Sequence, residues 1–253
     1  KTHAKALLIV RREDSGLVRY AHLGTGNYHP RTARLYSDFG LMTCNEEITN
    51  DVSEVFKQLT GLGKARTLKH LWQAPFTLQP NVVAGIRAEA DTARAGGKGR
   101  VVAKMNSLVE PEVINALYEA SQAGVSIDLM IRGVCALRPG VPGLSDNIRV
   151  RSIIGRFLEH HRIFYFYAGG KENVYLSSAD WMERNFFKRI ELAFPILDPK
   201  LKKRVITEGL KFYLADNQQG WDMNGAGAYQ RRRSARAKPH NAQGELMITL
   251  GGG

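Results

Sequence analysis

Two histidines in this sequence open apolar runs and are each followed, two positions later, by a basic residue. His3 precedes Lys5 and His160 precedes Arg162, and each pair opens an apolar run of the kind that forms a β-strand. Alternate residues of a strand point to the same face, so we expect each imidazole to lie beside its cation. A neutral imidazole can attack phosphorus while a neighbouring cation offsets the charge of the phosphate oxygens. The pattern therefore predicts phosphate chemistry.

The two copies of this pattern match beyond the histidines, as an internal repeat should. In the first copy, a second apolar run ends in Thr25-Gly26-Asn27, and Asp38 follows. In the second copy, the corresponding run ends in Ser178-Ala179-Asp180, and Glu191 follows. The carboxylate lies eleven positions after the end of the run in both copies (38 − 27 = 191 − 180). This agreement in order and spacing favours one site built twice over a chance pairing.

Each part of the repeat suits a phosphate site. We expect the strand ends that carry Asn27 and Asp180 to bring hydroxyl and amide groups to the phosphate oxygens. We expect Asp38 and Glu191 to hold the second nitrogen of an imidazole, which fixes its tautomer and orientation. Two copies that face one another would form a single phosphate site with two histidines.

Strands and helices alternate along the chain, which predicts a layered α/β fold. Periodicity and turn residues predict strands over residues 5–11, 17–23, 37–43, 100–106, 126–132, 149–154, 162–167, 174–177 and 190–196. They predict helices over residues 51–59, with Asn50 as the N-cap, and over 80–95, 111–123 and 199–214. Residues 61–64 are a candidate linker between two domains. After about Trp221 the chain is rich in Gly, Arg and Ala, and we expect a mobile tail.

Composition limits the classes of partner. The chain has 253 residues and a formal net charge of +12, so it should attract polyanions such as nucleic acid, anionic lipid, nucleotide or polyphosphate. Its two cysteines, Cys44 and Cys135, are far apart and have no metal-binding spacing, which favours reduced thiols in a cytosolic protein. No apolar run approaches the roughly 20 residues of a membrane span.

Longer sequence segments indicate a specific family. The segments KTHAKALLIVRRE, HLGTGN followed by TARLY, and VYLSSADWMERN resemble the two C-terminal catalytic domains of the histidine-phosphorylating polyphosphate kinases. The resemblance covers roughly residues 1–215. It implies two phospholipase D-like α/β domains, of which the first is truncated at its N-terminus. The implied divisions are 1–66 for the end of the first domain, 67–220 for the second, and 221–253 for a basic tail.

The resemblance also implies a reaction. Members of this family transfer the terminal phosphate of ATP reversibly to inorganic polyphosphate through a phosphohistidine. His3 matches the phosphorylated histidine, and His160, rather than its neighbour His161, matches the second histidine of the active site. Tyr36 and Arg132 match positions that contact the nucleotide.

Further expectations concern the surroundings of this site. Lys5, Arg132 and Arg162 would offset phosphate charge in the transition state. Magnesium is implied as a cofactor, with ligands outside this chain. The expected partners are ATP, ADP and inorganic polyphosphate, with no nucleic acid, in a homo-oligomer that is cytoplasmic or membrane-associated.

Two other functions fit parts of the pattern. One is a phospholipase D-like phosphodiesterase or nuclease, which shares the paired histidines. Such hydrolases carry an Asp about seven residues after each histidine, where this chain has Val10 and Tyr167. The other is a non-catalytic polyanion-binding module, for which an oriented histidine would have no purpose.

Overall fold

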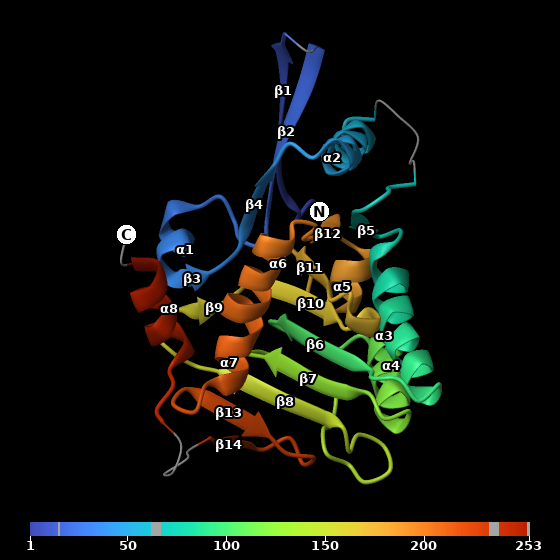
Figure 1. The fold of residues 1–253 in the computed structure, drawn as a ribbon, viewed down its shortest axis with the longest axis vertical. Coiled ribbons are helices and arrows are strands. Elements are labelled where there is room, and N and C mark those ends of the chain that lie inside the picture. The colour runs from blue at the N-terminus through green and yellow to red at the C-terminus, as the bar shows by residue number, and fades with distance from the viewer. Residues whose placement is uncertain (15, 62–66, 233–237, 252–253) are drawn as a thin grey trace.

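The computed structural model describes residues 1–14, 16–61, 67–232 and 238–251 (Figure 1). Within these residues the main feature is a nine-stranded mixed sheet. From one edge to the other, its strands are β14 (Tyr229–Arg231), β13 (Gly220–Met223), β8 (Ile148–Ile153), β7 (Ser126–Ile131), β6 (Arg100–Met105), β10 (Arg162–Phe166), β11 (Asn173–Ser177), β12 (Glu191–Pro195) and β5 (Trp72–Ala74). The neighbours β6, β7 and β8 run parallel, and every other pair is antiparallel.

Helices cover both faces of this sheet, which confirms the α/β prediction. On one face, α3 (Leu78–Arg94) and α4 (Pro111–Gln122) pack against alternate strand residues such as Val101 and Ile127. On the other face, Val102 and Met130 contact the helical segment α6 (Pro199–Arg204), η2 (Val205–Lys211) and α7 (Phe212–Ala215). The sheet is buried on both sides because its central strands are apolar at nearly every position. None of the described helices is long and apolar enough to cross a membrane.

A smaller three-stranded sheet comes from the start of the chain. It has the order β1 (Lys5–Glu13), β2 (Gly16–Gly24), β4 (Gly40–Thr43), and its β1–β2 hairpin projects away from the main sheet (Figure 1). Helix α2 (Glu46–Leu59) packs on it through Ile48, Val52 and Val55. Between β2 and β4 lie α1 (Pro30–Leu35) and β3 (Tyr36–Ser37), and β3 pairs in parallel with β9 (Leu158–Glu159).

Several elements differ from the sequence prediction. The strand predicted over 37–43 is interrupted at Asp38 and Phe39, which leaves Asp38 free of any ladder. The second helix begins earlier than expected, because Asn45 rather than Asn50 accepts a hydrogen bond from the amide of Ile48 at 3.0 Å. The short helices α1 and α5 (Glu183–Phe187) and the strands β5 and β9 were not predicted. Apart from Gly61, the expected linker lies outside the described residues.

Much of the tail expected after Trp221 is regular structure in the part of it that the structure describes. Strands β13 and β14 extend the main sheet beyond β8. Helix α8 (Ala242–Gly251) then packs beside α7, with Ala242 and Gln243 buried. These strands were not predicted, because β13 holds only single apolar residues, such as Trp221 and Met223, in a Gly- and Arg-rich segment.

Candidate active site

The first histidine is positioned by backbone contacts with the second half of the chain. The amides of His3 and Ala4 donate to the carbonyl of Ile190 at 2.9 and 3.0 Å, and the amide of Ile190 donates to Lys1 at 3.0 Å. This pairing brings the His3 ring to Glu191, where Nδ1 lies 2.9 Å from each carboxylate oxygen. A carboxylate only accepts hydrogen bonds, so Nδ1 carries the proton and the lone pair of His3 is on Nε2.

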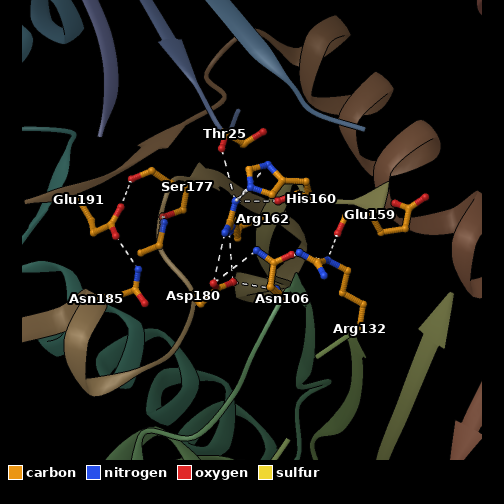
Figure 2. A network of polar contacts seen from close by, with 12 residues as sticks. Thr25, Asn106, Arg132, Glu159, His160, Arg162, Ser177, Asp180, Asn185 and Glu191 are labelled. Atoms are coloured by element: carbon orange, nitrogen blue, oxygen red, sulfur yellow. Dashed lines mark hydrogen bonds and ion pairs between the residues drawn. The ribbon is translucent and has the colours of Figure 1, made fainter. Parts of the chain in front are cut away.

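Glu191 is itself rigidly held. It opens β12 and is fully buried, and its carboxylate accepts hydrogen bonds from the Ser178 hydroxyl and the Asn185 amide. Figure 2 shows Asn185 and Glu191 at one end of the polar network. These donors fix the direction of the carboxylate and therefore the orientation of the imidazole.

Lys5 lies beside the free nitrogen of His3. Its ammonium donates to His3 Nε2 at 3.0 Å and to the His3 carbonyl at 2.6 Å. Burial lowers the pKa of Lys5 to about 8, although the charge of Glu191 opposes this change. The Lys5 ammonium therefore lies close to the position that the oxygens of a phosphate bound to Nε2 would occupy.

The second histidine is positioned in the same way by the first half of the chain. Strand β3 pairs with β9, and the amides of His160 and His161 donate to the Ser37 carbonyl at 3.2 and 2.9 Å. His160 Nδ1 then lies 2.8 and 3.0 Å from the two oxygens of Asp38. Burial lowers the pKa of His160, against the raising effect of the Asp38 hydrogen bond, so its imidazole is neutral at pH 7.

Asp38 is held by the strand end of its own copy. The Thr25 hydroxyl donates to Asp38 Oδ1 at 2.7 Å, as the Ser178 hydroxyl does to Glu191. Gly26 has no Cβ for a steric reason, since a Cβ there would lie 2.3 Å from Asp38 Oδ2. The first residue of each strand end therefore anchors the carboxylate that follows it.

The carboxylates are exchanged between the copies of the repeat. Glu191 of the second copy contacts the histidine of the first, and Asp38 of the first contacts the histidine of the second. The structure thus brings His3, His160, Asp38 and Glu191 together in one arrangement. Sequence spacing alone could not reveal the exchange.

Arg162 is the cation beside His160. It is buried, and it forms a two-pronged ion pair with Asp180, with Nε to Oδ1 at 3.1 Å and Nη2 to Oδ2 at 3.2 Å (Figure 2). Its Nη1 donates to His160 Nε2 at 3.1 Å. Burial would raise the pKa of Asp180, but the Arg162 charge and hydrogen bonds outweigh it and hold that pKa below its usual value.

Arg132 follows β7 and approaches the same network. Its Nε donates to the Asn106 side chain at 2.7 Å and to the Glu159 carbonyl at 2.6 Å. Its two terminal amino groups have no partner among the residues that the structure describes. Burial and the nearby Arg162 charge lower the pKa of Arg132. An anion bound here would satisfy these free donors.

The two remaining predicted residues differ in their placement. The Tyr36 ring lies 5.0 Å from the His160 ring and lines a mostly apolar cavity of about 320 Å³ between α1, η2 and α8. Asn27 is exposed, and its side chain makes no hydrogen bond within the described ranges. Its counterpart Asp180 is inside the network, so the structure does not bring Asn27 into the cluster as it does Asp180.

The sequence analysis did not predict a buried ion pair next to His160. Lys104 and Glu159 form an ion pair at 2.5 Å, and Glu159 also accepts from Ser37 at 3.0 Å and from Gln243 of α8 at 2.6 Å. Burial opposes ionisation of both groups; the pKa of Lys104 falls to about 8, while the Lys104 charge and hydrogen bond hold that of Glu159 at about 2. The sequence contains one indication of this pair, which is a lysine, Lys104, within the apolar strand β6.

The residues that the structure describes do not form a magnesium site. No cluster of three or more His, Cys, Asp or Glu side chains in the described part of the chain could hold a metal ion. The three carboxylates near the histidines, Asp38, Asp180 and Glu191, are already committed to His160, Arg162 and His3.

Comparisons with known proteins agree with this architecture. A family model described as polyphosphate kinase C-terminal domain 1 matches residues 1–65, and one described as polyphosphate kinase C-terminal domain 2 matches residues 71–243. The fold is that of the C-terminal domains of this kinase class. The chain belongs to the polyphosphate kinase family.

Individual relatives give the extent of the match. Polyphosphate kinases from Burkholderia cenocepacia (strain HI2424) and Paraburkholderia phytofirmans are 65% and 64% identical, each over 98% of this chain and 36% of the relative. The crystal structure of polyphosphate kinase from Porphyromonas gingivalis aligns with a TM-score of 0.94 and 39% identity, over all of this chain and 39% of that one. A phospholipase D family member, Nuc from Salmonella typhimurium, aligns over 61% of this chain and 96% of its own with a TM-score of 0.44 and 16% identity. The chain thus spans about 36% of the length of the curated relatives.

Proposed function

We propose that this chain carries the phosphate-transfer site of a polyphosphate kinase, which moves the terminal phosphate of ATP reversibly to inorganic polyphosphate through a phosphohistidine on His3. The observation that supports this best is the matched pair of imidazoles. Each has Nδ1 on a carboxylate and Nε2 beside a cation. That arrangement suits a nitrogen nucleophile for phosphorus.

In the first half-reaction, the lone pair of His3 Nε2 attacks the γ-phosphorus of ATP. The N–P bond forms as the bond from phosphorus to the β,γ-bridging oxygen breaks, and the electron pair leaves with ADP. Glu191 holds the Nδ1 proton throughout, so it stabilises the positive charge that develops on the ring. Lys5, which donates to Nε2 in the resting site, turns to the transferring phosphate oxygens.

In the second half-reaction, a terminal oxygen of polyphosphate attacks the same phosphorus and the N–P bond breaks. The imidazole then regains its lone pair, and the polyphosphate chain is longer by one phosphate. His160 is neutral and lies against Arg162, so the pair can bind and orient the incoming terminal phosphate. Both half-reactions exchange one high-energy phosphate bond for another, which suits a reversible enzyme.

Two features support a nucleotide at this site. Arg132 offers two unpaired amino groups to phosphate oxygens, and Tyr36 lines a cavity of about 320 Å³ that is large enough for a purine base. ATP, ADP and polyphosphate are therefore the proposed partners. Magnesium is expected with the nucleotide, held by ligands other than the described residues of this chain.

The proposal is tested by labelling the full-length protein with γ-labelled ATP. Wild type should acquire acid-labile label, His3→Ala should acquire none, and His160→Ala should keep label while polyphosphate synthesis slows. His70→Ala is the matched control, because its ring contacts Glu47 away from the site. Full labelling of His3→Ala would overturn the proposal. In that case hydrolysis of a phosphodiester substrate and salt-sensitive polyanion binding would be measured next.

A further inference from the structure

Asn106 lies between the two arginines of the site, at the point where β6 ends. Its side-chain oxygen accepts from Arg132 Nε at 2.7 Å. Its backbone amide donates to Asp180 Oδ1 at 2.7 Å, and its side-chain amide faces Asp180 Oδ2 at 3.4 Å. Asp180 in turn holds Arg162. Figure 2 shows the resulting chain of contacts from Arg162 through Asp180 and Asn106 to Arg132.

The two guanidinium groups need such a connection because they repel one another. The charge of Arg162 lowers the pKa of Arg132, which means that each cation disfavours the other. Asp180 neutralises Arg162 directly, but in the described structure it accepts no hydrogen bond from Arg132 and acts on it only through its charge. Asn106 is the residue that presents an acceptor to Arg132 and donors to Asp180 at the same time.

We infer that Asn106 is a positioning residue that fixes the Arg132 guanidinium, relative to Arg162, for contact with a phosphate group. This inference rests on the proposed function. Asn106 accepts from the Nε of Arg132, and both terminal amino groups are left without a hydrogen-bond partner among the described residues. A guanidinium held in this way loses little conformational freedom when it binds an anion, so more of the interaction is available to the transition state.

The position is rigid because the backbone is fixed as well. The carbonyl of Asn106 accepts from the amide of Gly133 at 2.7 Å, immediately after Arg132. A Cβ on Gly133 would lie 2.8 Å from that carbonyl oxygen, so the ends of β6 and β7 approach closely only because residue 133 is glycine. Asn106 is 8% exposed and therefore has little room for another side-chain conformation.

The chemistry requires an amide at this position. An aspartate would still accept from Arg132, but it would lose the donor that faces Asp180 and place two carboxylates side by side. One of the pair would then hold a proton more tightly. An alanine would leave Arg132 Nε with the Glu159 carbonyl alone.

The test is a double-mutant cycle in the full-length protein, with polyphosphate synthesis as the readout. Asn106→Ala should lower kcat/KM by about 10- to 100-fold in the wild-type background, as loss of an orienting partner commonly does. In an Arg132→Ala background the same change should cost less than about threefold, because its target is gone. In a Lys5→Ala background it should keep its full effect, since Lys5 does not contact Asn106 or Arg132 in the described structure.

A second variant gives a readout that simple loss of structure would not produce. Asn106→Asp should shift the activity optimum to more acidic pH, because protonation restores a donor toward Asp180. Equal losses for Asn106→Ala in all three backgrounds, or an unshifted pH profile for Asn106→Asp, would overturn the inference. Labelling of wild-type protein on His3 reports separately on the proposed function. If that labelling is present while the cycle is additive, only the role of Asn106 is wrong.

Discussion

The two copies of the repeat use the same chemistry in different surroundings. In each, a hydroxyl holds a carboxylate, the carboxylate holds the histidine of the other copy, and a basic residue lies at Nε2. The second copy is enclosed, since β10 is hydrogen-bonded to β11 on one side and β6 on the other. In the described residues β1 has only β2 as a ladder partner. The His3 side chain is 21% exposed, compared with 9% for His160.

This difference in burial favours different roles for the two histidines. The less buried histidine, His3, lies beside a lysine and is the more accessible of the two to a bulky phosphate donor. The enclosed histidine is held by Arg162, which is itself fixed by Asp180, and that arrangement suits the binding of a phosphate in one orientation. Changes at the two carboxylates, at Lys5 and at His161 should therefore affect the two copies differently.

The largest expected effect comes from the two orienting carboxylates. Glu191→Gln should slow labelling of His3 on the order of 1,000-fold, because the neutral amide no longer stabilises the charged ring or selects its tautomer. Asp38→Asn should leave labelling within about threefold of wild type and slow transfer to polyphosphate by about 100-fold. Rapid-quench measurement of label on the protein, followed by a polyphosphate chase, separates the two steps.

The crossed contacts make this experiment selective. If each carboxylate served the histidine of its own copy, Asp38→Asn would abolish labelling and Glu191→Gln would spare it. Glu245→Gln on the exposed face of α8 is a suitable control, since it removes a carboxylate at a distance from both imidazoles.

A smaller effect on activity is expected from the titration of Lys5, the cation beside His3. Burial places the pKa of Lys5 at about 8 in the free protein. Below this pH Lys5 is charged, and as pH rises through 8 the charge that offsets the phosphate oxygens is lost. The kcat/KM for ATP should therefore fall above about pH 8.

Replacement by arginine tests the cause of this decline. Lys5→Arg should flatten the alkaline limb, because a guanidinium stays charged, at a cost of about 3- to 10-fold in the maximum since the two cations differ in shape. An alkaline limb that is unchanged in Lys5→Arg would mean that another group controls it.

Much of this site could be predicted from the sequence, because its chemistry is local. Alternation along a strand placed Lys5 beside His3 and Arg162 beside His160, and both contacts are present. The central strands of the main sheet were also predicted at close to their observed residues, because apolar runs and turn residues are short-range signals.

The exchange of carboxylates was not predictable, because it depends on contacts across the chain. His3 and Glu191 are 188 positions apart, and the pairings of Thr2 with Ile190 and of Ser37 with Glu159 that bring the copies together are each only one or two residues long. Asn106 escaped notice for a related reason. A single polar residue at the end of a strand has no distinguishing pattern until its neighbours in space are known.

The last contrast concerns stability and the residue between each histidine and its cation, which is Ala4 in the first copy and His161 in the second. His161 is buried against Phe39 and Tyr213, and burial lowers its pKa to about 3. In the unfolded chain its pKa is about 6.5. Between these values the unfolded state binds a proton that the folded state refuses, so stability falls as pH decreases from 6.5 toward 3.

At pH 5 this linkage should cost about 2 kcal/mol relative to pH 7, an order-of-magnitude figure from 1.36 kcal/mol per pH unit. His161→Gln should reduce the loss, since an amide does not titrate. Urea unfolding at pH 5 and pH 7 measures the difference. Equal acid sensitivity in wild type and His161→Gln would show that the enclosed copy is no more vulnerable to protons than the exposed one. The contrast between the copies would then be confined to their chemistry and would not extend to their stability.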